Sequence, residues 1–566
     1  MNKDYQKMAA AIPAEERPIS SKAASGIGNF FGLYGGEHIA ATEFVIGATL
    51  VTWGVKASDI FIGLIIGNIL ATLTYAWICA PIAVDTRLTL YAYLKKVVGP
   101  YYQKIYNFVW GLASIAMAAS MLTVSASALR EIFKVPIQTE WYPTNVKFIL
   151  IVVVLGIVVT LVAANGFQAV ANFSSVCAPW MIVAFFCGAV VALPQLIEAT
   201  GFHGVKSFGD FLELCNTSVW NGEVEAGGTH LTVIHVAAFA WQCNLAYHGG
   251  LNDMSLFRFA KKKEYGYVPA FGMFVGHFFA WCCAGIMGAT AAILLNTSLS
   301  QLDSGAVTNT VLGAMGLLAV IIAGWTTANP SIYRASLSYE TIFPGMGNKK
   351  LTYMVGIFMT VMACFPITAN VMTIVNIIVL IVPAVGAICI AEHWILPRLG
   401  GTRYWAMYRG DKVNKAALIA WGVSLVFVII MKAGNLIHSY LLFLPTYILA
   451  IVVYLVLALK MGAKEDYSEQ VLDYNRTQEE LEKIIDAEAL NAKPENITIP
   501  AYTKLTQPIS WGILAAIVVM ACMTFTGSLA VSVFETCGFA LTVVYFVLGV
   551  ITTYGRFYSK SARGMA

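Results

Sequence analysis

The sequence predicts an all-α protein that crosses a lipid bilayer many times. Its 566 residues are 58% hydrophobic and only 12% charged, and the mean hydropathy is +0.72. Soluble domains do not have this composition, so we expect the lipid bilayer to cover much of the surface. A bilayer core is spanned by roughly 20 apolar residues of helix. Runs of this kind predict fourteen spans, near 27–54, 57–83, 105–129, 147–164, 170–195, 229–251, 267–295, 306–330, 352–370, 371–396, 415–433, 440–460, 509–528 and 534–555.

The loops between the predicted spans indicate how the chain is oriented. About 25 polar residues precede the first span without the cleavage site of a signal peptide, so this span is expected to stay in the mature protein. By the positive-inside rule, the cation-rich loops and both termini are cytoplasmic, in a plasma (inner) membrane. The net charge of +4 resides in these loops, so no nucleic-acid partner is expected. Lys and Arg gather after even-numbered spans, from Arg87 to Lys104, Arg258 to Lys263, Arg334 to Lys350 and Arg398 to Lys415.

Two predicted spans five apart are interrupted by glycine and polar residues. The first reads "GLYGGEHIAATEFVIG" and the sixth "AFAWQCNLAYHGGLND". Irregular backbone at membrane depth is tolerated where it is buried in protein or lines a cavity. Broken helices at corresponding positions of two five-span halves are typical of an inverted repeat that holds a transport site at the bilayer midplane.

Changes in composition and the spacing of the broken spans predict six segments. Residues 464–490 are charged and carry an apolar stripe, which predicts a cytoplasmic helix, either a solvated surface helix or one that regulates or binds a partner. The segments are a cytoplasmic tail (1–25), a first inverted repeat with spans 1–5 (26–200), a second inverted repeat with spans 6–10 (201–400), spans 11–12 (401–463), a cytoplasmic helical linker (464–507), and two further spans with a cytoplasmic tail (508–566).

Paired hydroxyls in the eighth span are candidate ligands for a coupling ion. Thr326 and Thr327 precede Pro330, which removes a backbone donor and frees a carbonyl one turn earlier. Together with carbonyls near Ala40 and Ala41, which the break in the first span frees, they would give sodium the oxygen ligands that a hard cation prefers. The alternative is that both hydroxyls bond to their own helix or to a neighbouring one.

Acidic and polar side chains beside the break in the first span are candidate site residues. Glu37, His38 and Glu43 lie within or next to it. A carboxylate inside a membrane is costly unless it is paired, hydrated or protonated, so such residues are functional candidates. Either glutamate could be protonated or could bind substrate. The alternative is a glutamate near the external mouth that accepts hydrogen bonds from helix-terminal amides.

The sixth span offers aromatic and amide side chains around its own break. Trp241, Gln242 and Asn244 suit a flat polar heterocycle, because an aromatic face stacks on the ring and an amide reads its donor and acceptor edges. Taken alone, a tryptophan here would more often be a packing residue. Beside a break at membrane depth, contact with a ligand is favoured.

These motifs together resemble the nucleobase:cation symporter family, also called the purine-cytosine permease family. The resemblance covers roughly residues 26–400 and rests on four stretches in the family's order: "HIAATEFVIG", "APIAVDTRLTLYAYLKKVVGP", "NDMSLFRFAKK" and "WTTANPSIYRAS". It implies a LeuT-like fold, with substrate between spans one, three, six and eight and sodium between spans one and eight.

The resemblance also implies roles for individual residues. Thr326 and Thr327 match the family's sodium-binding hydroxyl pair, Trp241 or Asn244 matches the stacking position of the sixth span, and Glu43 matches an acidic residue of one branch. The family commonly has an asparagine directly after the hydroxyl pair, where this chain has Ala328 and, one position later, Asn329. Asn329 is therefore the candidate amide for reading the substrate. Twelve spans are usual in the family, against the fourteen predicted here.

The sequence thus predicts a transporter that moves a nucleobase-like or related heterocycle by cation-coupled symport and alternating access. Sodium and protons both stay open as the coupling ion, and no cofactor is expected. The chain has no HExxH, GxxxxGK[ST] or GxSxG motif, so we do not expect an enzyme. A transporter of amino acids or amines on the same core is the main alternative, and a channel is disfavoured by the repeat-related breaks.

Overall fold

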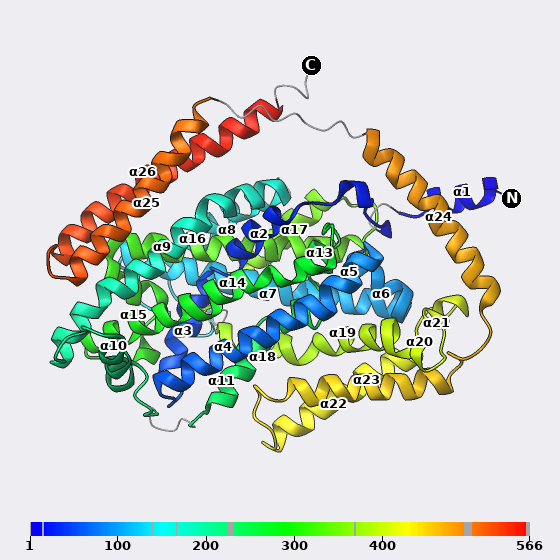
Figure 1. Cartoon of the computed structure of the whole chain (residues 1–566), viewed down its shortest axis with the longest axis horizontal. Helices are drawn as coiled ribbons and strands as arrows, with labels where there is room; N and C mark the ends of the chain where they lie inside the picture. The colour runs from blue at the N-terminus through cyan, green and yellow to red at the C-terminus, as the bar shows by residue number, and fades with distance from the viewer. Residues whose placement is uncertain are drawn as a thin grey trace.

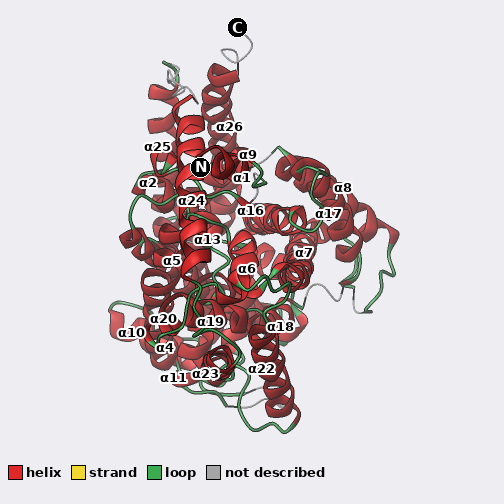
Figure 2. Cartoon of the chain, turned by 90° about the vertical axis from the view of Figure 1, so that its right-hand side faces the viewer, coloured by secondary structure: helices red, strands yellow, loops and turns green. Residues whose placement is uncertain are grey.

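The computed structural model describes residues 2–13, 16–138, 140–165, 167–224, 230–366, 370–491 and 501–561. Within these ranges the regular structure is helical, as expected (Figure 2). Eleven of the described helices are long and apolar enough to cross a membrane. The other three predicted spans are the two broken helices and a helix of 16 residues, α17. The chain is therefore a multi-pass membrane protein of the predicted fold class.

The first five spans contain one broken helix and one bulged helix. Span one consists of α2 (Ile27–Glu37) and α3 (Ala41–Val51). Span two contains a π-helical turn, Tyr75–Cys79, between α4 (Ala57–Thr74) and α5 (Ala80–Thr86). Spans three to five are α7 (Pro100–Ile132), α8 (Val146–Ala164) and α9 (Phe167–Thr200).

The next five spans repeat this pattern. Span six is broken into α11 (Val233–Gln242) and α12 (Leu245–His248). Span seven has a π-helical turn, Phe274–Ala280, between α14 (Pro269–Met273) and α15 (Trp281–Leu294). Spans eight to ten are α16 (Ser304–Glu340), α17 (Asn348–Ala363) and the series α18 (Val371–Ile381), α19 (Pro383–Ile390), a π-helical turn (Ala391–Ile395) and α20 (Leu396–Arg398).

The remaining helices lie around this core. Four are spans: α22 (Lys415–Ala433), α23 (Phe443–Lys460), α25 (Thr503–Phe525) and α26 (Val531–Ser561). The α25–α26 pair packs against α9 at one edge, and α22 and α23 lie at the opposite edge (Figure 1). Shorter or surface helices are α1 (Asn2–Ala10), α6 (Leu90–Val98), α10 (Phe208–Leu214), α13 (Met254–Phe257), α21 (Trp405–Tyr408) and α24 (Ser468–Asn491).

The expected helix in residues 464–490 is present as α24, which lies beside α1 (Figure 1). Its apolar stripe contacts α1 through Ala9, Leu481 and Ile485. Ion pairs join it to the N-terminal segment, with 3.3 Å from Arg17 to Glu488 and 2.8 Å from Lys22 to Asp486. The helix is therefore held to the segment that leads into α2. Residues 492–500 of the predicted linker lie outside the described ranges.

The packing of the core follows a spacing of five spans. The long helix α7 packs along α16, and α8 packs against α17. Two further extensive contacts are α3 with α15 and α4 with α11. If each span of the first five is exchanged with its counterpart in the second five, the contacts α7–α16 and α8–α17 map onto themselves. The contacts α3–α15 and α4–α11 map onto each other. An inverted five-plus-five repeat requires this pairing, and we keep 26–200 and 201–400 as the proposed extents of its halves.

The α8–α17 contact shows the repeat in its side chains. Residues 155–163 read "LGIVVTLVA" and residues 355–363 read "VGIFMTVMA". A Cβ added to Gly156 would lie 2.2 Å from Thr360 Oγ1, and one added to Gly356 would lie 2.2 Å from Thr160 Oγ1. Small residues let membrane helices approach closely. A glycine of each helix therefore packs against a threonine of the other: Gly156 against Thr360, and Gly356 against Thr160.

Substituting Gly156→Ala should destabilise the fold by about 1–3 kcal/mol, because the added methyl group overpacks this contact. The measurement is the thermal unfolding midpoint of the protein in detergent. Gly422→Ala is the matched control, since Gly422 lies in α22 with no atom within 4 Å of its added Cβ. An unchanged midpoint for Gly156→Ala would contradict the close contact, whereas partial recovery in Gly156→Ala with Thr360→Ala would support it.

Candidate functional site

The break in span one and the end of α12 in span six are both buried against glycines of neighbouring spans. In span one, residues 38–40 separate α2 from α3. A Cβ on Gly276 of span seven would lie 1.7 Å from the carbonyl oxygen of His38, and a Cβ on Gly386 of span ten would lie 2.0 Å from that of Gly249, directly after α12. Only glycine permits such an approach of backbone to backbone. Irregular backbone at membrane depth is thus enclosed by protein, as the physical argument requires.

A small cavity of about 70 Å³ lies between the two breaks. Four residues expected at the site line it: Glu37, Glu43, Asn244 and Thr327. They come from α2, α3, the turn before α12, and α16. The broken spans and span eight therefore meet at one place. Three further lining residues that the next paragraphs use are Tyr247, His277 and Arg334.

The two threonines point their hydroxyls back along their own helix. Thr326 Oγ1 donates to the carbonyl of Ala323 at 2.9 Å, and Thr327 Oγ1 donates to the same oxygen at 3.1 Å. This is the local bonding that the sequence left open as the alternative role. A hydroxyl that donates one hydrogen bond keeps its acceptor lone pairs. Thr327, at the cavity, can still offer an oxygen to a cation, while Thr326 is 2% exposed.

Glu43 caps its own helix and also faces the cavity. Its carboxylate accepts hydrogen bonds from the Ala40 backbone amide at 2.6 Å and from Thr42 Oγ1 at 2.9 Å. The other carboxylate oxygen lies 3.8 Å from Nε2 of His277, in the π-helical turn of span seven. An acid in the first turn also suits the positive end of the helix dipole. Glu43 thus caps α3, which is the alternative role that the sequence left open, and it also lines the cavity.

The remaining candidates lie outside the cavity lining. Trp241 donates from Nε1 to Thr74 Oγ1 at 3.0 Å and meets the Phe443 ring edge-on. Gln242 is 1% exposed, and its Oε1 has no hydrogen-bond partner among the described residues. His38 is buried too, with Nδ1 3.0 Å from the Tyr34 carbonyl oxygen.

Asn329 is held by one neighbouring helix and by its own. With its amide oriented to satisfy both ends, Nδ2 donates to the Val159 carbonyl at 2.9 Å and Oδ1 accepts from Trp325 Nε1 at 3.0 Å. The amide therefore joins α16 to α8. This placement gives Asn329 a bonding role between helices at the position where the resemblance suggested substrate contact.

Arg334 is the principal site residue that sequence reasoning missed. We placed it in a loop after span eight, and this was wrong: α16 continues through Pro330 to Glu340, and Arg334 is 5% exposed. The hydropathic run ends near residue 330 because the following turns carry polar residues toward the protein interior. The available signal was helical spacing, since Thr327, Ser331 and Arg334 lie on one face of α16.

Arg334 connects three elements through buried charges. Its Nη2 donates a hydrogen bond to Oε1 of Glu37, which lies at the end of α2. The same nitrogen donates to Oδ1 of Asp253, which follows α12, at 3.2 Å. Its guanidinium carbon lies 4.6 Å from the centre of the Tyr247 ring. Asp253 also accepts a hydrogen bond from the Tyr34 hydroxyl at 3.1 Å. We call Glu37, Asp253 and Arg334 the charge triad.

The site carries more acidic than basic side chains. Glu37 and Asp253 share Arg334, Glu43 lies against His277, and both His277 and the nearby His38 are buried. Buried charges of one sign are costly unless a counter-charge or protonation offsets them. An excess of carboxylates therefore favours a bound cation or proton and disfavours an anionic ligand.

Comparisons with known proteins agree with this geometry. No protein-family model matches the sequence, and no curated protein matches it. Among solved structures, Mhp1, a nucleobase-cation-symport-1 family transporter in a closed conformation with bromovinylhydantoin bound, is 14% identical with a TM-score of 0.62, over 82% of this chain and 99% of that one.

Two further solved structures have the same architecture. The inward-facing conformation of Mhp1 is 13% identical with a TM-score of 0.62, over 82% of this chain and 98% of that one. A Na⁺-coupled sialic acid symporter in a substrate-bound outward-open state is 13% identical with a TM-score of 0.54, over 81% and 92%. The chain therefore has the LeuT-like fold of these transporters, and its expected likeness to the nucleobase:cation symporters is confirmed at the level of the fold.

Proposed function

We propose that the protein is a secondary active transporter of the nucleobase:cation symporter type, which couples a cation gradient to uptake of a small heterocycle. The observation that carries the proposal is the acid-rich cavity enclosed between two broken helices five spans apart. Half-helix ends at membrane depth are typical of sites that bind a substrate and an ion together. The fold shared with known symporters supports the same conclusion.

The lining favours a neutral or cationic substrate. Asn244 offers an amide at the break of span six, and Tyr247 offers an aromatic side chain one turn later. An amide and a ring suit a flat heterocycle with a donor and acceptor edge. Glu37 and Glu43 would repel a free carboxylate. The same acidic excess supports a second candidate, a transporter of cationic amines.

Sodium is the coupling ion that we propose first. Thr327 at the cavity and Thr326 beside it would supply hydroxyl oxygens, and the break near Ala40 and Ala41 would supply carbonyls. A sodium ion there would offset part of the acidic excess. Coupling to protons is the alternative, in which Glu37 or Glu43 takes up the proton.

The charge triad would close the cavity on the side of the N-terminus. Glu37 ends α2, and Arg334 lies about two turns beyond Thr327 toward the C-terminal end of α16. Opening the cavity to that side requires α2 to move away from α16, which separates Glu37 from Arg334. With the predicted orientation, this is the cytoplasmic side. Alternating access would then include breaking and remaking the triad.

The proposal is tested by uptake into proteoliposomes of labelled cytosine, uracil, adenine, allantoin and small amines, with and without an inward sodium gradient at fixed pH. We expect sodium-driven accumulation of at least one heterocycle. Accumulation driven only by a pH gradient would transfer the coupling role to the glutamates. Accumulation of amines alone would favour the second candidate, and no accumulation of any compound would contradict the proposed function.

The double variant that carries both Thr326→Ala and Thr327→Ala should need roughly tenfold or more sodium for the same uptake. Each lost ligand removes a charge-dipole contact worth about 1.5–3 kcal/mol. The measurement is uptake as a function of sodium concentration. Ser338→Ala is the matched control, since its hydroxyl also donates to a carbonyl of α16, that of Ala335, away from the cavity. An unchanged sodium dependence in the double variant would reject the proposed sodium ligands.

Neutralising one member of the triad in Glu37→Gln should favour the form that opens toward the N-terminal side, because one ion pair of the closed form is lost. Cys243 lines the cavity and can report this opening through its reaction with a membrane-impermeant maleimide in inside-out vesicles. We expect labelling several times faster than in the wild type. Glu198→Gln, at the exposed end of α9, and Cys243→Ser are the controls. Equal labelling rates would argue against a gate at the triad.

A further inference from the structure

Three consecutive lysines lie just before span seven, between α13 and α14. Lys261, Lys262 and Lys263 are all exposed, and none of them makes an ion pair within the part of the chain that the structure describes. Glu264 follows directly, which leaves an excess of positive charge. We call residues 261–263 the lysine turn.

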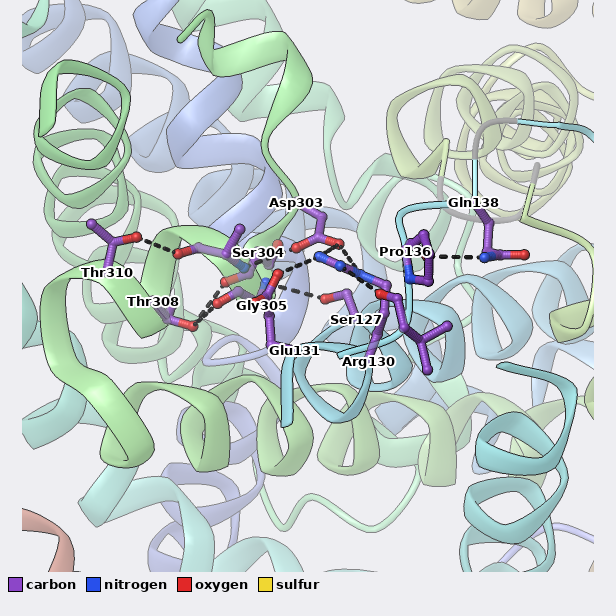
Figure 3. A network of polar contacts seen from close by, with 12 residues as sticks. Ser127, Arg130, Glu131, Pro136, Gln138, Asp303, Ser304, Gly305, Thr308 and Thr310 are labelled. Carbon is purple, nitrogen blue, oxygen red and sulfur yellow. Dashed lines mark hydrogen bonds and ion pairs between the residues drawn. The ribbon is translucent and has the colours of Figure 1, made fainter. Parts of the chain in front are cut away.

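Several cations at the ends of other spans find their partners inside the protein. On the far side of the core, Nη2 of Arg130 lies 2.8 Å from Asp303 and 2.6 Å from Glu131 (Figure 3). Beside α6, Nζ of Lys95 lies 2.6 Å from Glu16. The lysine turn differs from these groups, because its charge is left available to a ligand.

The backbone around the lysine turn is fixed by packing and hydrogen bonds. On one side, Nη1 of Arg87 donates to the carbonyl of Ala260 at 2.6 Å. On the other side, a Cβ added to Gly266 would lie 2.6 Å from Cα of Ala76, in the π-helical turn of span two. The three lysines are therefore carried by a segment that is held to span two at both of its ends.

An exposed aromatic pair lies next to the lysine turn. Trp77, which follows Ala76 in the π-helical turn, is 61% exposed and donates from Nε1 to the hydroxyl of Tyr267 at 2.9 Å. Tyr267 is 48% exposed. Tryptophan and tyrosine with an apolar ring and a polar tip gather at the level of the lipid headgroups. The pair therefore places the lysine turn at the membrane interface, which is the cytoplasmic one in the predicted orientation.

The surface beyond the aromatic pair, toward the middle of the membrane, is apolar. Phe271 is exposed on α14, four residues after Tyr267, and Ile66 and Ile69 are exposed on α4. The ring of Phe271 meets that of Phe31 on α2 edge-on, with 5.8 Å between the ring centres. Because α14 packs against both α2 and α4, an acyl chain on this surface lies beside the half-helix that carries the charge triad's glutamate.

We propose that the lysine turn and the Trp77–Tyr267 pair form a binding site for an anionic phospholipid. The lysines bind the phosphodiester and its net negative charge, the aromatic pair borders the glycerol region, and one acyl chain follows Phe271. A zwitterionic headgroup would bring its own cation to an already positive turn, so the charge favours an anionic lipid. The proposal goes beyond the transport function and does not depend on which substrate or coupling ion the protein uses.

The test is native mass spectrometry of the full chain in detergent, titrated separately with phosphatidylglycerol and phosphatidylcholine of the same acyl chains. We expect the first bound phosphatidylglycerol to have a dissociation constant at least roughly tenfold lower than that of phosphatidylcholine. Replacing the lysine turn with three glutamines, in Lys261→Gln with Lys262→Gln and Lys263→Gln, should remove this preference. Replacing it with three arginines should keep it.

The matched control removes the same number of exposed lysines elsewhere, in Lys104→Gln with Lys349→Gln and Lys350→Gln. This variant should keep the preference for phosphatidylglycerol. Should the triple glutamine variant not fold, Lys262→Glu changes a single exposed side chain and should weaken phosphatidylglycerol binding several-fold.

Three results would overturn the lipid site. The first is equal affinity of the wild type for the two lipids. The second is an unchanged preference in both the triple glutamine variant and Lys262→Glu, or a loss of preference in the matched control that equals the loss in the glutamine variant. The third is displacement of phosphatidylglycerol by an equal concentration of glycerol 3-phosphate, which would identify a site for a free phosphate. None of these results bears on uptake, so the proposed transport function is judged separately.

Discussion

The structure depends on one constraint, which is that backbone groups freed from a helix inside a membrane must be enclosed by protein. Spans one and six both break at this depth; the break in span one lies against Gly276, and the backbone directly after α12 of span six lies against Gly386. The approach is so close that a methyl group at either glycine would overlap a carbonyl oxygen. Because irregular backbone in both spans is enclosed by protein in this way, polar groups of the two spans can face a shared cavity without contact with lipid.

Charge burial is the second consequence of that enclosure. The carboxylate that ends α2 is largely shielded from water, and Arg334 of α16 supplies its counter-charge. Asp253 joins the same arginine, so elements from three separate parts of the chain depend on one guanidinium. Removing one partner of a buried ion pair is far more costly than the pair is favourable. In the proposed transport cycle, separating the triad would therefore require water or another charge to replace the contacts that are lost.

Much of this architecture follows from sequence, because hydropathy and glycine placement report directly on burial in a bilayer. The breaks in spans one and six, the helix at 464–490 and the convergence of Glu37, Glu43, Asn244 and Thr327 were all expected from such patterns. Arg334 was not, since a hydropathy run treats an arginine as the end of a span even when the helix continues through it. Its partners lie 81 and 297 residues away in the chain, and no local pattern reports such distances.

The roles of Trp241 and Asn329 show a second limit. Both residue types suit a ligand, yet both side chains find protein partners, Thr74 in one case and Val159 with Trp325 in the other. Which hydrogen-bond partner a buried amide or indole finds depends on how closely the neighbouring helices approach it. Composition and spacing do not carry that information.

The reciprocal contact of Gly156 and Gly356 has a mechanical consequence. Spans four and nine interlock without a gap, and α7 and α16 run along each other beside them, so these four helices have no room to slide individually. They act as one stiff frame assembled from both halves of the chain. For the proposed alternating access, the hinges would then lie where α2, α3, α11 and α12 meet the frame, at the ends of the broken helices.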